Sequence, residues 1–482
     1  VYTYAVLLGM GGSSLAPEVF SRVFSVVSQG MRLHVLDTTN PDQIATVESQ
    51  IQLSQTLFLV SSKSGGTIEP NSLFSYFWSK LDDGSHYAAI TDAGTSLEKL
   101  AKAHNFRRVF TNPGDIGGRY SALSYFGLVP AALVGVDVGL LLERAGEMAE
   151  ACGSGVPAEQ NPALQLGAGI GAWTRAGRDK LTFIASPELA ALGAWLEQLI
   201  AESTGKQGRG IVPIAGEDVG ATAVYGEDRV FVQLGLGGTN DGQGAALTGL
   251  EGIAPVVRIC LRDRYDLGRE FFRWEYATAM AGLELEINPF DEPNVQESKD
   301  NTLRVLQQYL QGGAKAAGFS AAPSAVSNGF KLFAPQAASL SSWVGMVRPG
   351  NYIAIMAYLE RSAEIETLLG QLRRQLRDVL HVATTVGFGP RFLHSTGQLH
   401  KGGANNGVFL QITAPPRRDL DIPFEKYTFA TLLGAQALGD YESLVKHERR
   451  VLRVDIGTDT AGALQKLVQE YQAVSSGAGA RA

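Results

Sequence analysis

The sequence predicts an α/β protein whose sheets are mainly parallel. Short apolar runs alternate with helical patterns along the chain, beginning with residues 4–8, 33–36 and 56–60. This alternation is typical of βαβ units, in which a helix connects two parallel strands. Glycine- or serine-rich turns follow the first and third of these runs. Because ligands bind at the carboxyl ends of parallel strands, we expect a ligand site at these turns.

The chain is long enough for several domains of this kind. Its 482 residues correspond to about two to four domains. The first series of strands and helices occupies residues 1–150, and a second series occupies residues 151–305. A third α/β series follows over residues 330–470. We therefore expect two α/β domains and a C-terminal α/β extension.

Composition and charge exclude several classes of function. The formal charge is −7 and there is no basic stripe, so nucleic acid is not an expected partner. No run of 18 apolar residues is present, and we expect no membrane span. The two cysteines, Cys152 and Cys260, cannot form a disulfide framework, which favours a cytoplasmic location. The chain enters a core-like strand almost at Val1, and we expect it to be part of a longer polypeptide.

The strongest single motif is the loop at residues 61–67. It combines Lys63 with three hydroxyl side chains, Ser62, Ser64 and Thr67, between a predicted strand and a predicted helix. Hydroxyl and backbone N–H groups in such a loop can surround a phosphate dianion. It is not a P-loop, because the lysine precedes the glycines. The alternative is a capped helix start, in which Ser64 or Thr67 serves as the N-cap.

Two further glycine turns carry weaker signals. The turn at residues 9–14, which contains Gly12 and Ser13, also connects a strand to a helix. It could hold an anion, but its spacing is wrong for dinucleotide binding, and a purely structural turn is equally compatible. Arg119 follows two glycines and offers a fixed fork of donors for an oxyanion. Its alternative is a surface arginine in a loop.

A predicted helix after Ser186 carries a candidate base. Gln198 and Glu202 are four residues apart, on the side opposite a stripe of leucines. A glutamate at the end of this helix could be a general base, although an ordinary solvent-facing glutamate is the alternative. A later turn, residues 288–294, leads into a helix that carries Lys299.

Histidines are scarce, and two of them share one loop. His394 and His400 lie in a polar, glycine-bounded segment. No third metal ligand accompanies them, and the chain has no His-Glu-x-x-His helix, so we expect no metal.

Together these motifs resemble the glucose-6-phosphate isomerase family, which is built from two sugar-isomerase (SIS) domains. Five strings carry the resemblance, in the order of the family: Gly11–Ser13, Ser62–Glu69, Gly117–Ser121, Glu202–Lys206, and Asn288–Asp291 through to Lys299. Residues 389–403 resemble the C-terminal part of the isomerase half of bacterial bifunctional transaldolase/glucose-6-phosphate isomerase fusions. The second resemblance implies a transaldolase half upstream of the present residues.

The resemblance implies a fold and an activity. The fold would be two SIS-type α-β-α sandwich domains with parallel sheets, plus the C-terminal α/β extension. The activity would be interconversion of glucose 6-phosphate and fructose 6-phosphate through a cis-enediol, in glycolysis and gluconeogenesis. The substrate would be a small sugar phosphate, no cofactor would be needed, and a homodimer is expected. Two alternatives stay open, namely an SIS isomerase of mannose 6-phosphate or an amino sugar phosphate, and a non-catalytic phosphosugar-binding module.

The resemblance also implies roles for the matching residues. The 6-phosphate would be held by one loop, through Ser62, the Lys63 backbone, Ser64 and Thr67. Gly12 and Ser13 would line the sugar site, and Gln198 would border the phosphate or the sugar. Glu202 would move a proton between C1 and C2, and Arg119 would stabilise the enediolate oxygen. Lys299 would assist at the ring oxygen. Aldose–ketose isomerisation needs such a base and such a fixed cation, because a weak C–H acid is deprotonated beside a carbonyl.

The chain departs from the family pattern at two places. Glu292 stands seven residues before Lys299, where the family usually has glutamine. The histidine that the family uses in ring opening is also missing from the corresponding stretch, which includes residues 238–244. We predict that His394 or His400 takes its place from the C-terminal extension.

Overall fold

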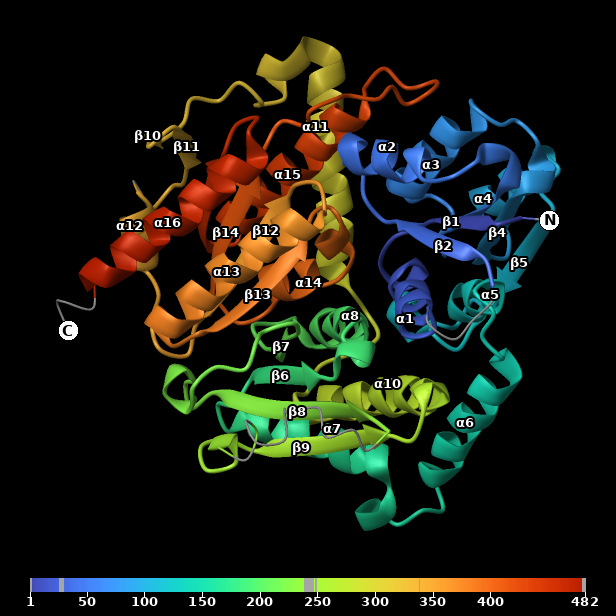
Figure 1. The fold of residues 1–482 in the computed structure, drawn as a ribbon, viewed down its shortest axis with the longest axis horizontal. Helices are drawn as coiled ribbons and strands as arrows, with labels where there is room; N and C mark the ends of the chain where they lie inside the picture. The colour runs from blue at the N-terminus through green and yellow to red at the C-terminus, as the bar shows by residue number, and fades with distance from the viewer. Residues whose placement is uncertain (1, 26–29, 238–246, 248, 338, 479–482) are drawn as a thin grey trace.

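The computed structural model describes residues 2–25, 30–237, 247, 249–337 and 339–478. The chain forms three sheets, as the alternating pattern predicted, and the sheets are built mainly from parallel strands. In Figure 1 the first sheet lies at the right in blue, the second below it in green, and the third at the left in orange and red. No helix in the described residues is long and apolar enough to cross a membrane.

The first sheet has the strand order β2-β1-β3-β4-β5. Its strands are β1 (Tyr4–Leu8), β2 (Arg32–Leu36), β3 (Thr56–Ser61), β4 (Tyr87–Asp92) and β5 (Arg108–Asn112). Its helices are α1 (Leu15–Val23), α2 (Pro41–Ser49), α3 (Ile68–Trp78), α4 (Ser96–Ala103) and α5 (Tyr125–Leu133), whereas the next helix, α6 (Val138–Ala151), packs against the second unit. Leu8 at the end of β1 pairs in register with Val60 near the end of β3. The turn after β1 and the loop after β3 therefore emerge side by side at one edge of the sheet.

The second sheet has the order β7-β6-β8-β9. Its strands are β6 (Lys180–Ala185), β7 (Val212–Ile214), β8 (Arg229–Leu236) and β9 (Val256–Leu261), and the helices are α7 (Pro162–Arg175), α8 (Leu192–Thr204) and α10 (Leu267–Glu284). α8 packs against α10 through aromatic side chains. The rings of Trp195 and Phe271 contact each other edge to face, with centroids 4.7 Å apart. This packing fixes α8, the helix that carries Gln198 and Glu202.

The third sheet has the order β10-β11-β15-β14-β12-β13. Its strands are β10 (Ala325–Ser327), β11 (Phe330–Phe333), β12 (Tyr352–Tyr358), β13 (Ala383–Phe388), β14 (Gly407–Thr413) and β15 (Arg450–Asp455). Its helices are α12 (Leu340–Val344), α13 (Ala363–Leu380), α14 (Gly397–Gly402), α15 (Phe429–Lys446) and α16 (Thr460–Ala478). The four strands from β12 to β15 are parallel, whereas β11 runs antiparallel to β15.

All three sheets share one arrangement of their first four parallel strands. The second strand lies outside the first, and the third and fourth lie on the other side of it, as in β2-β1-β3-β4, β7-β6-β8-β9 and β13-β12-β14-β15. The C-terminal extension therefore repeats the architecture of the first two units. Sequence patterns did not reveal this, because strand order depends on long-range pairing.

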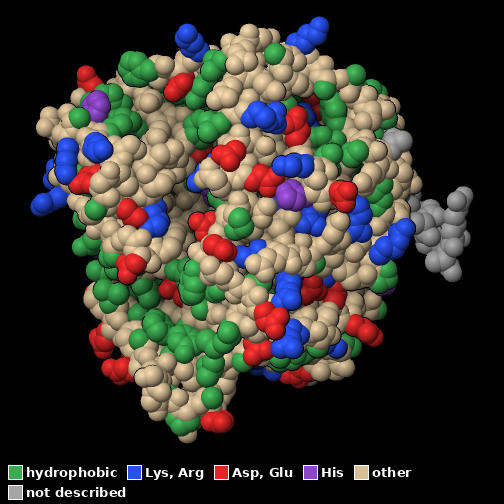
Figure 2. All heavy atoms as spheres, turned by 180° about the vertical axis from the view of Figure 1, so that it is seen from behind, with side chains coloured by type: hydrophobic (Ala, Val, Ile, Leu, Met, Phe, Trp, Pro, Cys, Tyr) green, Lys and Arg blue, Asp and Glu red, His purple; other side chains and the backbone are tan. Residues whose placement is uncertain are grey.

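α11 (Pro293–Ala316) connects the second unit to the third and is the long yellow helix in Figure 1. Its side chains Val305 and Leu306 are buried in one hydrophobic cluster with Leu432 and Leu438 of α15 and with residues of the first unit. The domain limits stay a prediction, but the middle of α11 packs against the first and third units at once. On the face shown in Figure 2, lysine and arginine side chains are interspersed with aspartate and glutamate.

Candidate active site

Glu202 and Gln198 lie inside the protein, at the end of α8. Their exposed fractions are 6% and 3%, so Glu202 is not the solvent-facing glutamate that was the alternative. The side of α8 opposite the leucine stripe is covered by the third unit. A Cβ atom on Gly205, just after α8, would lie 2.3 Å from the Cα of Leu399 in α14. The third unit therefore closes over the helix that sequence patterns had left open to solvent.

Arg119 is buried in a 3-10 turn (Gly118–Tyr120) and reaches the same helix. Its Nε donates to Ser203 Oγ at 2.7 Å, and its Nη1 lies 3.2 Å from Glu202 Oε1 and 2.9 Å from Glu292 Oε2. A Cβ atom on Gly12 would lie 1.9 Å from the carbonyl oxygen of Gly118, so only glycine allows the two turns to meet. Arg119 is therefore not a surface arginine.

The charges around Glu202 oppose one another. Burial raises the pKa of Glu202, while Arg119 and the hydrogen bond from Gln198 lower it and Glu292 raises it again. The net direction is upward. A carboxylate with a raised pKa is a stronger base when it is ionised, and the guanidinium beside it keeps the ionised form available. This combination is typical of a proton-transferring group.

The third unit delivers a histidine to this cluster. His394 lies in a 3-10 turn (Arg391–His394) that follows β13. The Nε2 of Gln198 lies 2.9 Å from the His394 carbonyl oxygen and 2.9 Å from Glu202 Oε2, so one amide bridges the two units. The His394 ring Nε2 lies 2.9 Å from Glu69 Oε1, in the first turn of α3. A carboxylate so placed holds the ring orientation and favours a proton on Nε2.

Glu69 is tied into a buried network that spans the first and third units. Its Oε1 also accepts from Gln436 Nε2 at 2.7 Å, and Gln436 Oε1 accepts from Thr39 Oγ1 at 2.6 Å. Burial alone would raise the pKa of Glu69, but His394 and, less strongly, Lys299 bring that pKa below its ordinary value. Glu69 is therefore an ionised carboxylate that faces His394 and senses the charge of Lys299.

His400 lies elsewhere, in the core of the third unit. It is 3% exposed, and its ring lies between those of Phe392 and Phe409, with centroids 6.2 and 5.1 Å away. Burial lowers the pKa of His400 to about 3. An imidazole so buried stays neutral across the physiological range. Of the two histidines in this loop, it is His394 whose carbonyl and ring contact the residues around Glu202.

The loop at residues 62–67 has the features of an anion site. The Ser62 hydroxyl donates to Thr67 Oγ1 at 3.0 Å and accepts from the Gly65 N–H at 3.2 Å. Thr67 occupies the N-cap position of α3 but makes no capping side-chain bond. Within the described residues the backbone N–H groups of Lys63, Ser64 and Thr67 make no hydrogen bond. Unpaired N–H groups at a helix N-terminus favour an anion.

Two side chains of this loop differ in direction. The Lys63 ammonium pairs with Asp92 and donates to the Gly114 carbonyl at 3.0 Å, so its side chain turns away from the free N–H groups. Ser64 is exposed, and its hydroxyl is open to a ligand. Gly65 has φ +69°, and a Cβ atom there would lie 2.8 Å from Thr95, which explains the glycine. Lys63 thus offers its backbone and not its charge.

Lys299 and Ser13 lie near this site without fixed partners. Lys299 is half-buried on α11 and makes no hydrogen bond or ion pair within the described residues, yet its charge contributes to the low pKa of Glu69. Ser13 is 8% exposed, and it follows Gly11, where a Cβ atom would lie 2.7 Å from the His394 carbonyl oxygen. Residues 238–244, which belong to the stretch where the resemblance implies a histidine, lie outside the described residues.

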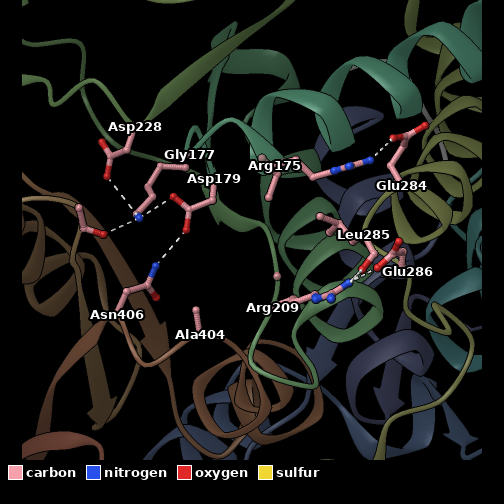
Figure 3. A pocket seen from close by; sticks show the side chains of 14 residues that line it. Arg175, Gly177, Asp179, Arg209, Asp228, Glu284, Leu285, Glu286, Ala404 and Asn406 are labelled. Carbon is pink, nitrogen blue, oxygen red and sulfur yellow. Dashed lines mark hydrogen bonds and ion pairs between the residues drawn. The ribbon is translucent and has the colours of Figure 1, made fainter.

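A polar hollow lies away from these residues. It has a volume of about 590 Å³ between the second and third units, and Figure 3 shows Asp179, Asp228, Arg209 and Asn406 around it. It lies where β6 and β8 begin, at the edge opposite their carboxyl ends. It contains no residue of the predicted site. Its charges are mutually paired, since Lys180 pairs with Asp179 and Asp228, and Arg209 pairs with Glu286.

Comparison with known proteins links the first part of the chain to one family. The model of the family "Phosphoglucose isomerase" matches residues 2–233. This segment is therefore similar to phosphoglucose isomerases. The matched segment contains every predicted site residue except Lys299, His394 and His400.

Individual relatives of this family match a similar region. A glucose-6-phosphate isomerase from Trichormus variabilis is 35% identical over 219 residues, which cover 43% of this chain and 40% of that protein. One from Symbiobacterium thermophilum is 32% identical over 293 residues, or 51% of this chain and 65% of that protein. The chain spans about 40% of the length of the first of these curated relatives.

Solved structures support the fold. A hypothetical protein from Thermus thermophilus superposes with a TM-score of 0.56 at 25% identity, covering 63% of this chain and 84% of that one. A glucose-6-phosphate isomerase from Chlamydia trachomatis superposes with a TM-score of 0.56 at 23% identity, covering 66% of this chain and 72% of that one. This likeness extends the α/β architecture beyond the matched phosphoglucose isomerase segment.

Sequence reasoning did not assign Glu69 or Gln436 to the site. Glu69 lies inside the matching string Ser62–Glu69, and an acid in the first turn of a predicted helix was the local signal. Its partners His394 and Gln436 are more than 300 residues away in the sequence. No pattern in a single sequence connects residues so far apart.

Proposed function

We propose that this protein interconverts glucose 6-phosphate and fructose 6-phosphate through a cis-enediol. The observation that carries the proposal is the position of Glu202. Its carboxylate is buried beside the Arg119 guanidinium, and the Gln198 amide bridges it to the loop of His394. A base, a fixed cation and a histidine–carboxylate pair are the groups that aldose–ketose isomerisation requires.

The phosphate binds at the loop of residues 62–67. The free N–H groups of Lys63, Ser64 and Thr67 and the hydroxyls of Ser62, Ser64 and Thr67 provide its hydrogen bonds. Gly12, Ser13 and Gln198 border the sugar between this loop and Glu202. Binding the distant phosphate orients the reacting carbons, and this orientation lowers the barrier without any contact at C1 or C2.

Ring opening is assigned to His394 and Lys299. With the Nε2 proton of His394 donated to Glu69, the other ring nitrogen is free to accept the O1–H proton of the cyclic sugar. The Lys299 ammonium supplies a proton to the ring oxygen as the C1–O5 bond breaks. One proton is removed and one is supplied, so the product is the neutral open-chain aldose.

Isomerisation is assigned to Glu202 and Arg119. Glu202 takes the proton from C2 of the aldose, and the proton of the O2 hydroxyl passes to O1, so that the intermediate is the cis-enediol in its enediolate form. Glu202 then delivers its proton to C1 as the C2–O2 carbonyl forms, which gives the ketose and returns Glu202 to its starting state. Negative charge develops on the oxygens of C1 and C2 during both transfers, and a guanidinium that is already in place stabilises that charge.

A coupled assay with both sugar phosphates tests the proposal on wild type and Glu202→Gln. We expect kcat to fall about 10²- to 10⁴-fold in the variant, because a positioned acid–base contributes that much, while calorimetry shows retained sugar phosphate binding. Glu188→Gln is the control, since Glu188 is exposed at the start of the same segment. Equal turnover in wild type and Glu202→Gln would reject Glu202 as the base. Arg119→Ala should lower mainly turnover, and an effect confined to binding contradicts its role.

The sequence resemblance supports further proposals about the setting of the enzyme. We propose a cytoplasmic enzyme of glycolysis and gluconeogenesis that acts as a homodimer. In the longer polypeptide the isomerase half follows a transaldolase half. Light scattering of the purified protein gives its mass, and a monomer at micromolar concentration contradicts the dimer.

A further inference from the structure

Every N–H group of Arg119 already has a partner in this structure. A guanidinium offers five N–H donors. Nε donates to Ser203 Oγ, and the two donors of Nη1 point to Glu202 Oε1 and Glu292 Oε2. The two donors of Nη2 point to the backbone carbonyl oxygens of Pro289 and Asp291, at 2.7 and 3.1 Å. No donor is left for an oxygen of a substrate, so one of these five bonds must break before Arg119 can act on the reaction.

Four of the five partners of Arg119 are held in place. The Ser203 side chain is fully buried, and that of Glu202 is 8% exposed. The two carbonyl groups belong to a loop that Lys206 holds, because its ammonium donates to the Asn288 carbonyl at 2.7 Å and pairs with Asp291 Oδ1 at 2.6 Å. None of these four acceptors can leave Arg119 without a change in the backbone or in a buried side chain.

The fifth partner, Glu292, is different. It stands at the N-cap position of α11, and its side chain is 45% exposed. Within the described residues Arg119 is the one side chain that forms a hydrogen bond with the Glu292 carboxylate, whose charge also acts on Glu202 and Lys206. A half-exposed carboxylate can exchange a guanidinium for water at small cost. Glu292 is therefore the partner that an incoming oxygen can displace.

We propose that Glu292 is a displaceable occupant of Arg119, which holds the guanidinium in position until the anionic oxygen that develops at C1–C2 takes over the same Nη1 donor. The proposal rests on the proposed function. It makes Glu292 a residue that sets how strongly the site binds anionic oxygen at that end of the sugar. Glutamine, which the resembling family has at this position, would compete less, because a neutral acceptor forms a weaker bond to a guanidinium than a carboxylate does.

Two ligands that differ only at C1 test this proposal by calorimetry. Arabinonate 5-phosphate carries a carboxylate where the enediolate oxygens develop, and arabitol 5-phosphate carries a neutral hydroxymethyl group there. In Glu292→Gln the arabinonate 5-phosphate should bind about three- to fivefold more tightly than in wild type, which corresponds to loss of one half-exposed ion pair. The affinity for arabitol 5-phosphate should change by less than about half of the factor expected for arabinonate 5-phosphate, because its hydroxymethyl group brings no negative charge to Arg119.

Asp291→Asn is the matched control. It removes one negative charge a single residue away, but the Asp291 side chain contacts Lys206 and not Arg119. Lys206 keeps its bonds to the two backbone carbonyls in this variant. Asp291→Asn should therefore change the affinity for arabinonate 5-phosphate by less than twofold. Glu292→Ala serves as a second variant, and it should tighten the binding in the same direction as Glu292→Gln.

The opposite result would overturn the proposal. If Glu292 only orders Arg119, its loss leaves the guanidinium less well placed, and arabinonate 5-phosphate binds more weakly in both variants. Equal tightening in Asp291→Asn would assign the effect to net charge and would also overturn it. Binding is measured without turnover, so an inactive wild type contradicts the proposed function while these affinities still decide the role of Glu292.

Discussion

Replacing Glu69 by glutamine removes the charge that faces His394 while keeping the shape of the side chain. The carboxylate lies 2.9 Å from the ring Nε2 and is 3% exposed, so water cannot replace it easily. A buried hydrogen bond to a charged group contributes about 1.5–3 kcal/mol. If that energy acts in the transition state for ring opening, kcat should fall about 10- to 100-fold in Glu69→Gln.

A double-mutant cycle with His394→Ala separates this role from simple structural damage. Because Glu69 is proposed to act through His394, its replacement should have little further effect on kcat once the ring is gone. Glu48→Gln is the control, since Glu48 also accepts bonds from a tyrosine and a lysine, Tyr76 and Lys80, on the outer side of the first unit. A kcat within twofold of wild type in Glu69→Gln, or an undiminished loss in the His394→Ala background, would refute the reasoning.

Three further predictions concern the ion pairs of Arg391 beside the His394 turn, the buried ammonium of Lys180, and the buried ring of His400. Arg391→Met removes two ion pairs, to Glu18 and Asp37, from the turn that carries His394, so kcat should fall about 10- to 100-fold because small displacements in a site are costly. Arg361 also pairs with Glu18, and its replacement in Arg361→Met should keep kcat near wild type. An equal fall of kcat in both variants would contradict a positioning role for Arg391. Lys180→Met removes the ammonium that pairs with Asp179 and Asp228 at the hollow of Figure 3, so urea denaturation should show a loss of about 3 kcal/mol in the free energy of unfolding, part of which Asp228→Asn restores; an unchanged midpoint contradicts this. The folded-state pKa of His400 is about 3, against an ordinary value of 6.5, so below about pH 6.5 the unfolded chain binds one proton more than the folded chain. The free energy of unfolding should therefore fall by about 1.4 kcal/mol for each pH unit below that value. In His400→Leu the urea midpoint should depend less on pH between pH 6 and pH 5, and a pH dependence equal to that of wild type would count against a buried neutral ring.

The loop that is proposed to bind the phosphate was recognisable in the sequence because it is local. One strand, one loop and one helix start bring Ser62, Ser64 and Thr67 together within six residues, and parallel pairing fixes the edge at which the loop emerges. The direction of Lys63 was not predictable from the loop. Its ammonium turns to Asp92, which belongs to the end of the next strand, β4. A side chain with several rotatable bonds follows its nearest partner in space and not its neighbours in sequence.

The chemical end of the site depended on long-range packing. The leucine stripe of α8 indicated that Gln198 and Glu202 lie on the opposite side of the helix. A single sequence does not show whether that side faces solvent or packs against another unit of the same chain. The third unit covers that side and brings His394 with it. The sequence also did not show which of the two histidines points toward the site. The His394 ring faces Glu69, whereas the His400 ring faces Phe392 and Phe409.

By itself the sequence determined the alternation of strands and helices, the loop at residues 62–67 that is proposed to bind an anion, and the residue types that isomerisation would need. Periodicity and turn chemistry are local properties, and they survive without knowledge of the fold. Only the tertiary structure decided that three sheets share one strand order, that Glu202 is buried, that Glu69 holds His394, and that Glu292 occupies Arg119. The reason is that these features join residues separated by 80 to more than 300 positions, and contacts at such separations are set by how the sheets pack against one another.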